Sequence, residues 1–444
     1  MRLGRTIATG VLLLACGGCL TTSDTGMSDA IDGGDTTDSK GDGSGPSPEV
    51  CNLKDDDLDG IIDEGCQTKP NLRADESWLD LGAVYVPGGP GPAPVKAFTM
   101  PVPGQWGVVL VARDVGGGNS AYVWAESLTG PNGKQWLTPG SWDLSPNRAW
   151  PSLGRATALI GMAPEVDPVA GVWKFSFTRS TQMPLNYKGS ATPGWLYLGM
   201  IGRLPLAGME QLNLDLDIFV VGGTAGGAAK LSASPQWKAI AGQVNAIWAP
   251  AKIQLGKVAF FDVSGDDGQK YLYVDDVSSA GSANEMSGLF EVLGKLRPTS
   301  TAVAVAVVSG IYDMGQPVAL GLSHLAGVPG MAGARSSGLV ISIDPQQWTK
   351  DQSALAGQSI AASVWGTTLA HELGHFMGLW HTDEFDGSLA DPIDDTSSCT
   401  ISASVLTPAL CPQQAQNLMF WSPAAANLSK GQVTVTRRHP AAGL

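Results

Sequence analysis

Three of the five histidines in this 444-residue chain fall within one window of eleven residues, at positions 371, 375 and 381. His371 and His375 are four residues apart, so a helix places both imidazoles on one face. His381 follows six residues after His375, and in an unbroken helix it would point away from that face. The helix must therefore end between them, and Gly378 can adopt the positive φ that such an end needs. Three neutral imidazoles held in this way are typical ligands of a zinc ion with one open position.

A carboxylate accompanies these histidines. Glu372 follows His371 directly, where its side chain can reach a water molecule on the metal. The run from His371 to His381 has the form H-E-x-x-H-x-x-G-x-x-H, and it resembles the metzincin zinc endopeptidases. The resemblance implies one catalytic Zn²⁺ held by the three histidines, with Glu372 as general base and then acid. It also implies a methionine turn below the metal, which Met419 in the run Asn417–Trp421 matches.

The first residues resemble an export signal. A basic start with Arg2 and Arg5 precedes the apolar run 7–15, which is too short to span a bilayer but suits the core of a signal peptide over residues 1–15. The run Leu13–Cys16 resembles a bacterial lipobox, which implies cleavage just before Cys16 and attachment of lipid to it. An ordinary signal peptide with a chance cysteine is the alternative. We expect an exported protein, lipid-anchored at the outer membrane or cell surface, or released from it.

Four of the five remaining cysteines form two local pairs, Cys51 with Cys66 and Cys399 with Cys411, and Cys19 is left over near the anchor. An exported chain permits disulfides, and the zinc-ribbon pattern of two C-x-x-C pairs does not occur. We therefore expect both pairs to be disulfides, with free thiols or a soft-metal site as the alternative.

An acidic stretch separates the leader from the body of the chain. Residues 16–50 are dominated by Thr, Ser, Asp, Gly and Pro, which predicts a disordered linker after the lipidated cysteine. Residues 51–66 then carry six acids within ten positions. Their spacing resembles the first nine positions of an EF-hand loop and the short Cys-flanked calcium repeats of secreted bacterial proteins. The expected Ca²⁺ ligands are Asp55, Asp57, Asp59, the carbonyl of Ile61, and Asp63.

That calcium loop has an alternative. The bidentate glutamate expected at position 12 is replaced by Cys66, so the segment could also be a solvated acidic patch. A second acidic stretch, from Asp383 to Asp395, raises the same choice between a structural calcium site and a solvated loop. The run Asp391–Thr396 and the Cys399/Cys411 pair look most like the pappalysin-type (cytophagalysin) branch of the metzincins. Trp421 stands where some branches have a tyrosine ligand, so a tyrosine-assisted site is not expected.

Residues 70–208 have the pattern of short strands. The chain holds 57 glycines and 29 prolines, which favour many turns over long helical bundles. Trp173, Phe175 and Phe177 alternate with more polar residues, which is the period of a half-buried strand. We expect an antiparallel β-sandwich here, serving as an accessory domain.

From residue 212 the pattern is mixed. Residues 212–444 are expected to form an α+β metzincin-like protease domain with a mixed, twisted sheet and an active-site helix. The expected strands are 212–221, 258–263, 302–308 and 339–343, and the expected helices are 234–253, 285–296 and one that starts near 359.

Charge restricts the partners. The net charge is −14, of which −9 lies in residues 1–66, so the chain lacks the basic footprint of a nucleic-acid binder. We expect a monomer that acts on protein or peptide substrates and touches a membrane only through its lipid. The leading hypothesis is a zinc-dependent endopeptidase. The alternative is a non-catalytic surface binding or adhesion protein that retains a zinc-stabilised metzincin fold.

Overall fold

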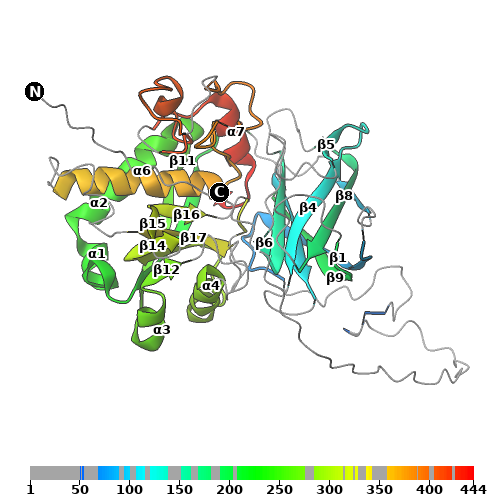
Figure 1. Ribbon diagram of the computed structural model, residues 1–444, viewed down its shortest axis with the longest axis horizontal. Helices are drawn as coiled ribbons and strands as arrows, with labels where there is room; N and C mark the ends of the chain where they lie inside the picture. Colours follow the sequence, from blue (N-terminus) through cyan, green and yellow to red (C-terminus); the bar gives the residue numbers. More distant parts are fainter. Residues whose placement is uncertain are drawn as a thin grey trace, which may run out of the picture.

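Two antiparallel sheets make up the N-terminal β-region, which we define as residues 76–203 of the computed structural model (Figure 1). The strand order of the first sheet is β1-β9-β3-β7, and that of the second is β2-β8-β4-β5, with β6 beside β4. The bounds of the strands are β1 Glu76–Val86, β2 Lys96–Met100, β3 Gly107–Asp114, β4 Tyr122–Thr129, β5 Gln135–Leu137, β6 Ser152–Leu153, β7 Arg155–Ile160, β8 Gly171–Ser180 and β9 Gly194–Arg203.

A shared core lies between these two sheets. Residues of both sheets pack into one apolar cluster, in which Trp173, Phe175 and Phe177 of β8 are each 1% exposed. The alternation that predicted this strand therefore marks the face of β8 that turns toward the other sheet. Because the first sheet faces this core on one side only, its other face is available for a second contact.

The C-terminal α/β region, residues 212–444, contains a sheet of order β11-β10-β13-β17-β16, and the short β18 pairs with β10. β10, β11, β13 and β17 run parallel, whereas the edge strand β16 runs antiparallel to β17. A second, small sheet has the order β12-β14-β15. The bounds are β10 Leu212–Val221, β11 Ile253–Val263, β12 Tyr273–Asp275, β13 Val303–Val308, β14 Gly310–Asp313, β15 Gln316–Ala319, β16 Gly321–Ser323, β17 Gly338–Ser342 and β18 Ala442–Gly443.

Helices cover both faces of the larger sheet. One face packs on α2 and α6, and the other packs on α4, so the region is layered (Figure 1). The helix bounds are α1 Ala228–Ala233, α2 Pro235–Trp248, α3 Gly265–Lys270, α4 Glu285–Leu296, α6 Gln358–Phe376 and α7 Lys430–Arg438, with 3-10 turns at Thr224–Gly226, Ala249–Ala251 and Gln414–Gln416. A mixed sheet with flanking helices is consistent with a metzincin-like peptidase domain, as the sequence predicts.

Two predicted boundaries in this region were wrong. The helix predicted over 234–253 begins after Ser234, whose side chain accepts a hydrogen bond from the Trp237 amide, but it ends at Trp248. Pro250 follows two residues later and cannot continue the helix. Strand β11 starts at Ile253 rather than at 258, because Ile253 is buried and pairs with Leu212.

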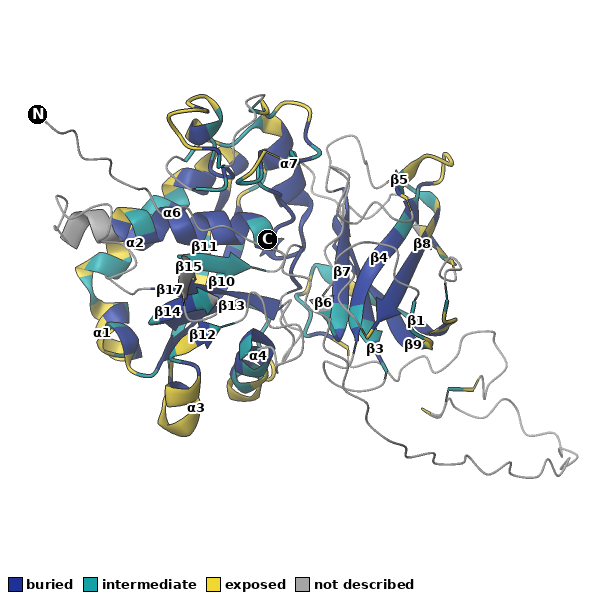
Figure 2. Ribbon diagram, in the orientation of Figure 1, coloured by how far each residue is buried: buried dark blue, intermediate teal, exposed yellow. Residues whose placement is uncertain are grey.

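The two regions share a core. Val109, Leu159 and Ile201, on the outer face of the first sheet, belong to the same apolar cluster as the core of the C-terminal α/β region. Arg203 is fully buried at this boundary and donates hydrogen bonds to the carbonyls of Arg437, His439 and Ala442. Figure 2 shows helix α7, largely buried, on the side of the α/β region that faces the β-region. The N-terminal β-region is therefore packed on the α/β region as one body.

The structure describes part of the chain. The described residues are 51, 53–54, 69–89, 95–100, 107–115, 121–138, 152–161, 169–181, 191–203, 208–275, 285–313, 316–323, 326–328, 337–342, 358–387, 389–399, 405–422 and 426–444. Within these ranges, no helix is long and apolar enough to cross a membrane. Cys16, Cys66 and the acidic residues 55–63 lie outside them, so the lipidation site, the Cys51–Cys66 disulfide and the calcium ligands stay predictions.

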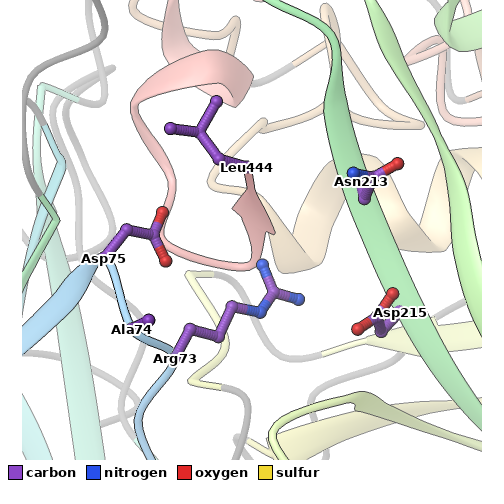
Figure 3. A pocket seen from close by; sticks show the side chains of 6 residues that line it. All are labelled: Arg73, Ala74, Asp75, Asn213, Asp215 and Leu444. Carbon is purple, nitrogen blue, oxygen red and sulfur yellow. The ribbon is translucent and has the colours of Figure 1, made fainter.

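A surface pocket lies near the end of the chain. Figure 3 shows the Arg73 side chain reaching from the residues before β1 toward β10. The pocket is lined by Arg73, Ala74, Asp75, Asn213, Asp215 and Leu444. None of these residues belongs to the histidine cluster, so this pocket is separate from the site described next.

Candidate metal centre

Helix α6 carries the site, and it is buried on nearly every side. Leu369, Ala370, Leu373 and Phe376 have no exposed surface, which is the pattern of a helix in the middle of a core. The helix ends at Phe376, and Gly378 follows with a φ of 96°. The Gly378 amide donates to the His375 carbonyl at 2.9 Å, and the Leu379 amide donates to the Gly374 carbonyl at 2.9 Å. This pair of bonds is a Schellman motif, and it turns the chain back as the sequence predicts.

The three histidines converge after this turn. The Nε2 atom of His381 lies 3.3 Å from Nε2 of His371 and 3.1 Å from Nε2 of His375. Among the described residues, these three are the one group of histidine, cysteine or acidic side chains with the spacing of a metal site. A metal ion that accepts one nitrogen from each ring fits this donor set.

Each ring is oriented through its other nitrogen. His371 Nδ1 donates to the Leu418 carbonyl at 2.7 Å, and His375 Nδ1 donates to the Leu379 carbonyl at 2.7 Å. His381 Nδ1 lies 3.0 Å from Oε2 of Glu384. These partners hold the proton on Nδ1 and leave the lone pair of Nε2 toward the common centre, which is the arrangement of metal-binding histidines.

Sequence reasoning missed Glu384 as a functional residue. It lies three residues after His381, and it was one acid among several in the run that begins at Asp383. The missing signal is three-dimensional, since only the turn after Gly378 brings this carboxylate to the far side of the His381 ring.

Burial sets the protonation of two site residues. Burial lowers the pKa of His371 to about 3, so its imidazole is neutral at pH 7, which is the form that binds metals. Burial also raises the pKa of Glu372 to about 8. A divalent cation at the imidazoles would favour the ionised form of this carboxylate. Gly321 of β16 packs against it, because a Cβ atom there would lie 2.4 Å from Cγ of Glu372.

Met419 lies below the helix, fully buried. A Cβ atom on Gly374 would lie 2.5 Å from the Met419 sulfur, so the glycine leaves the space that the thioether fills. The Met419 carbonyl accepts a hydrogen bond from the Thr382 amide at 2.8 Å, next to the ligand His381. The turn that contains Leu418 and Met419 thus contacts the site through a carbonyl, a sulfur atom and a backbone bond.

The Cys399–Cys411 disulfide is formed, as predicted, with Cα atoms 5.8 Å apart. Cys411 is buried beside Leu406 and Phe420. The Cys399 amide donates to Oδ1 of Asp383 at 2.9 Å, so the bridge also fixes the segment that follows the third histidine.

The acids that follow α6, the zinc helix, accept hydrogen bonds from protein groups. Asp391 accepts hydrogen bonds from the Ile393 amide and the Thr396 hydroxyl, and Asp395 accepts from Ser429 Oγ at 2.6 Å and the Gly431 amide at 2.9 Å. Within the described residues these carboxylates join no metal-site group. The calcium site considered for this segment therefore stays a prediction.

Part of the chain that contains the site matches a known protein family. Residues 354–439 match the model of peptidase family M43, described as pregnancy-associated plasma protein-A. The matched range holds the three histidines, Glu372, the disulfide and Met419. The match and the donor set together support a zinc metallopeptidase. A comparison with curated proteins gives no match.

Three solved structures show weak similarity. Metalloproteinase-II from Bacteroides fragilis is 12% identical, with a TM-score of 0.31 over 55% of this chain and 63% of that one, so the match spans just under two thirds of its length. Archaemetzincin from Methanopyrus kandleri is 15% identical, with a TM-score of 0.26 over 53% and 91%. A zinc-dependent peptidase from Methanocorpusculum labreanum is 13% identical, with a TM-score of 0.25 over 40% and 88%.

Proposed function

We propose that this protein is a zinc-dependent endopeptidase of the pappalysin-type metzincin branch, which hydrolyses peptide bonds in extracellular or surface proteins. The observation that carries the proposal is the convergence of three Nε2 atoms, with separations of 3.1 and 3.3 Å. The next residue after His371 on α6 is Glu372, which is buried. His371, His375 and His381 would hold the ion. When bound, zinc lowers the pKa of water and polarises the scissile carbonyl.

Glu372 moves the proton in this proposal. Its carboxylate accepts a proton from the attacking water and then delivers it to the nitrogen of the leaving amine. Burial raises the pKa of this group, whereas an ion at the imidazoles would favour its ionised form, which accepts the proton. Leu418, Leu379 and Glu384 keep the rings in the orientation that the reaction needs.

The edge strand β16 suits a polypeptide substrate. It is the last strand in the sheet order, and its Gly321 packs on Glu372. An extended peptide that adds to such an edge forms backbone hydrogen bonds independent of its side chains. We therefore expect the substrate chain to lie along β16, with its scissile bond beside Glu372.

The test replaces Glu372 alone. In Glu372→Ala, cleavage of casein or gelatin should fall by roughly 10³-fold or more, since the proton acceptor is lost. The zinc content should stay near one ion per chain, because the three imidazoles remain. If wild type and Glu372→Ala are equally inert on a broad peptide library while both hold zinc, a non-catalytic surface binding protein becomes the better assignment.

We also propose that the chain is exported and lipid-anchored through Cys16. Mass spectrometry of the mature N-terminus should find a diacylated or triacylated cysteine, and an unmodified terminus further along would exclude the anchor. The proposed calcium loop has its own test. Calcium titration of the oxidised peptide 51–66 should show saturable binding, and no heat at millimolar calcium would remove that ligand set.

A further inference from the structure

One short segment joins the N-terminal β-region to the end of the zinc helix. Thr157 of β7 is 8% exposed, and its Oγ1 donates a hydrogen bond to the Ala326 carbonyl at 2.6 Å. Ala326 belongs to the segment 326–328, which follows the edge strand β16 in sequence and is buried throughout. A hydroxyl of the β-region therefore contacts a backbone group of the α/β region directly.

The same segment completes the end of α6. The Ala326 amide donates to the His375 carbonyl at 3.2 Å, and the Gly327 amide donates to the Phe376 carbonyl at 2.8 Å. The last carbonyls of a helix lack partners within it. The Gly327 amide gives the Phe376 carbonyl a donor, and the Ala326 amide is a second donor to the His375 carbonyl, which also accepts from the Gly378 amide. A Cβ atom on Gly327 would lie 2.1 Å from the Phe376 ring, so only glycine allows this close approach.

Ala326 holds an uncommon backbone conformation. Its φ is 51°, in the left-handed region that non-glycine residues rarely adopt. Such a conformation persists where the surroundings fix it. Here the amide is held by His375 and the carbonyl by Thr157, on opposite sides of the same residue.

Strand β16, which precedes residues 326–328, contacts the candidate proton acceptor of α6, Glu372. Gly321 of β16 packs on Glu372, while Ala326 bonds to the backbone of His375. β16 itself is held by its pairing with β17, and the chain that follows it is held at Ala326. Thr157 supplies a hydrogen bond to Ala326 from the β-region, beside the apolar packing of residues such as Leu159.

We propose that Thr157 is a positioning residue of the peptidase site. Through Ala326 it fixes β16 relative to Glu372 and the zinc helix, so the N-terminal β-region sets the geometry of substrate binding. This inference rests on the proposed function for its kinetic consequence, although its structural consequence can be measured without turnover.

The experiment compares three variants of the full chain. Thr157→Val removes the hydroxyl at nearly constant volume, and Thr157→Ser restores it. Ser176→Ala is the matched control, because Ser176 is a buried β-region residue whose 2.7 Å hydrogen bond to Ser127 is confined to the second sheet. For a peptide substrate, Thr157→Val should lower kcat/KM by roughly tenfold, mainly through KM, because an acceptor at the site loses its donor. Thr157→Ser and Ser176→Ala should stay within about twofold of wild type.

Hydrogen exchange gives a readout that needs no activity. The amides of Ala326 and Gly327 should exchange at least tenfold faster in Thr157→Val and at the wild-type rate in the two other variants. Faster exchange in a protein that cleaves no peptide would support the positioning role and count only against the proposed function. Unchanged exchange in Thr157→Val, or equal effects in Ser176→Ala, would overturn the inference.

Discussion

Buried charges serve different ends in the two regions of this molecule. In the N-terminal β-region, Arg179 and Asp114 lie 3.0 Å apart with almost no exposure, and each neutralises the other. In the C-terminal α/β region, Glu372 is buried to a similar degree, yet burial alone raises its pKa, and no cation faces it among the described residues. A buried carboxyl without a partner is costly and is common at sites of chemistry. Arg179 and Asp114 thus satisfy one another within the fold, whereas Glu372 has no cationic partner among the described residues and is available to react.

Arg203 tests whether the N-terminal β-region and the C-terminal α/β region are stabilised as one unit, and its replacement has the largest expected effect. Replacing it in Arg203→Leu leaves the carbonyls of Arg437, His439 and Ala442 without their donor. We expect a loss of about 3 kcal/mol or more in the free energy of unfolding, measured by denaturant titration. The transition should stay single for both regions, since they share a core.

Lys174→Leu is the control for this variant, because Lys174 is exposed on β8. Its unfolding free energy should change by less than about 0.5 kcal/mol. Two separate transitions in the wild-type protein would contradict a common core.

Glu384 tests whether zinc affinity depends on the residue that orients the His381 ring as well as on the three ligand histidines. In Glu384→Gln the His381 ring keeps a hydrogen-bond acceptor but loses the charge that faces Nδ1. Zinc affinity, measured by competition with a chelator, should weaken roughly 10- to 100-fold. Asp386→Asn removes an exposed charge two residues away and should leave the affinity unchanged. Equal losses in both variants would point to a general effect of charge.

Stability should also depend on pH through His439. Burial, and then the charge of Arg203, lower the pKa of His439 to about 3, against about 6.5 in an unfolded chain. Between these values the unfolded chain binds a proton that the folded chain does not, so stability falls as the pH drops below about 6.5. The loss from this residue by pH 4.5 should be on the order of 2 kcal/mol.

His439→Asn should flatten this dependence while its side-chain oxygen accepts from the Ala441 amide in place of Nδ1. Unfolding curves at several pH values give the slope. An identical slope in the variant would assign the acid sensitivity to other groups.

The sequence predicts the part of the site that lies along one helix. The spacing of His371, His375 and His381 and the turn at Gly378 follow from helix geometry, and the structure has them where expected. Leu212–Val221 and Glu285–Leu296 also match, because continuous apolar runs and amphipathic periods are local signals. The contributions of Leu418 and Ala326 are backbone groups brought in by tertiary packing. No side-chain pattern encodes them, so sequence reasoning could not find them.

The shared core between the regions has a practical consequence. Expression of residues 212–444 alone would expose the apolar surface that Val109, Leu159 and Ile201 cover. It would also remove the hydroxyl group that donates to the Ala326 carbonyl. Apolar surface of that kind promotes aggregation in a truncated fragment. A shortened chain should therefore keep the β-strands together with residues 212–444.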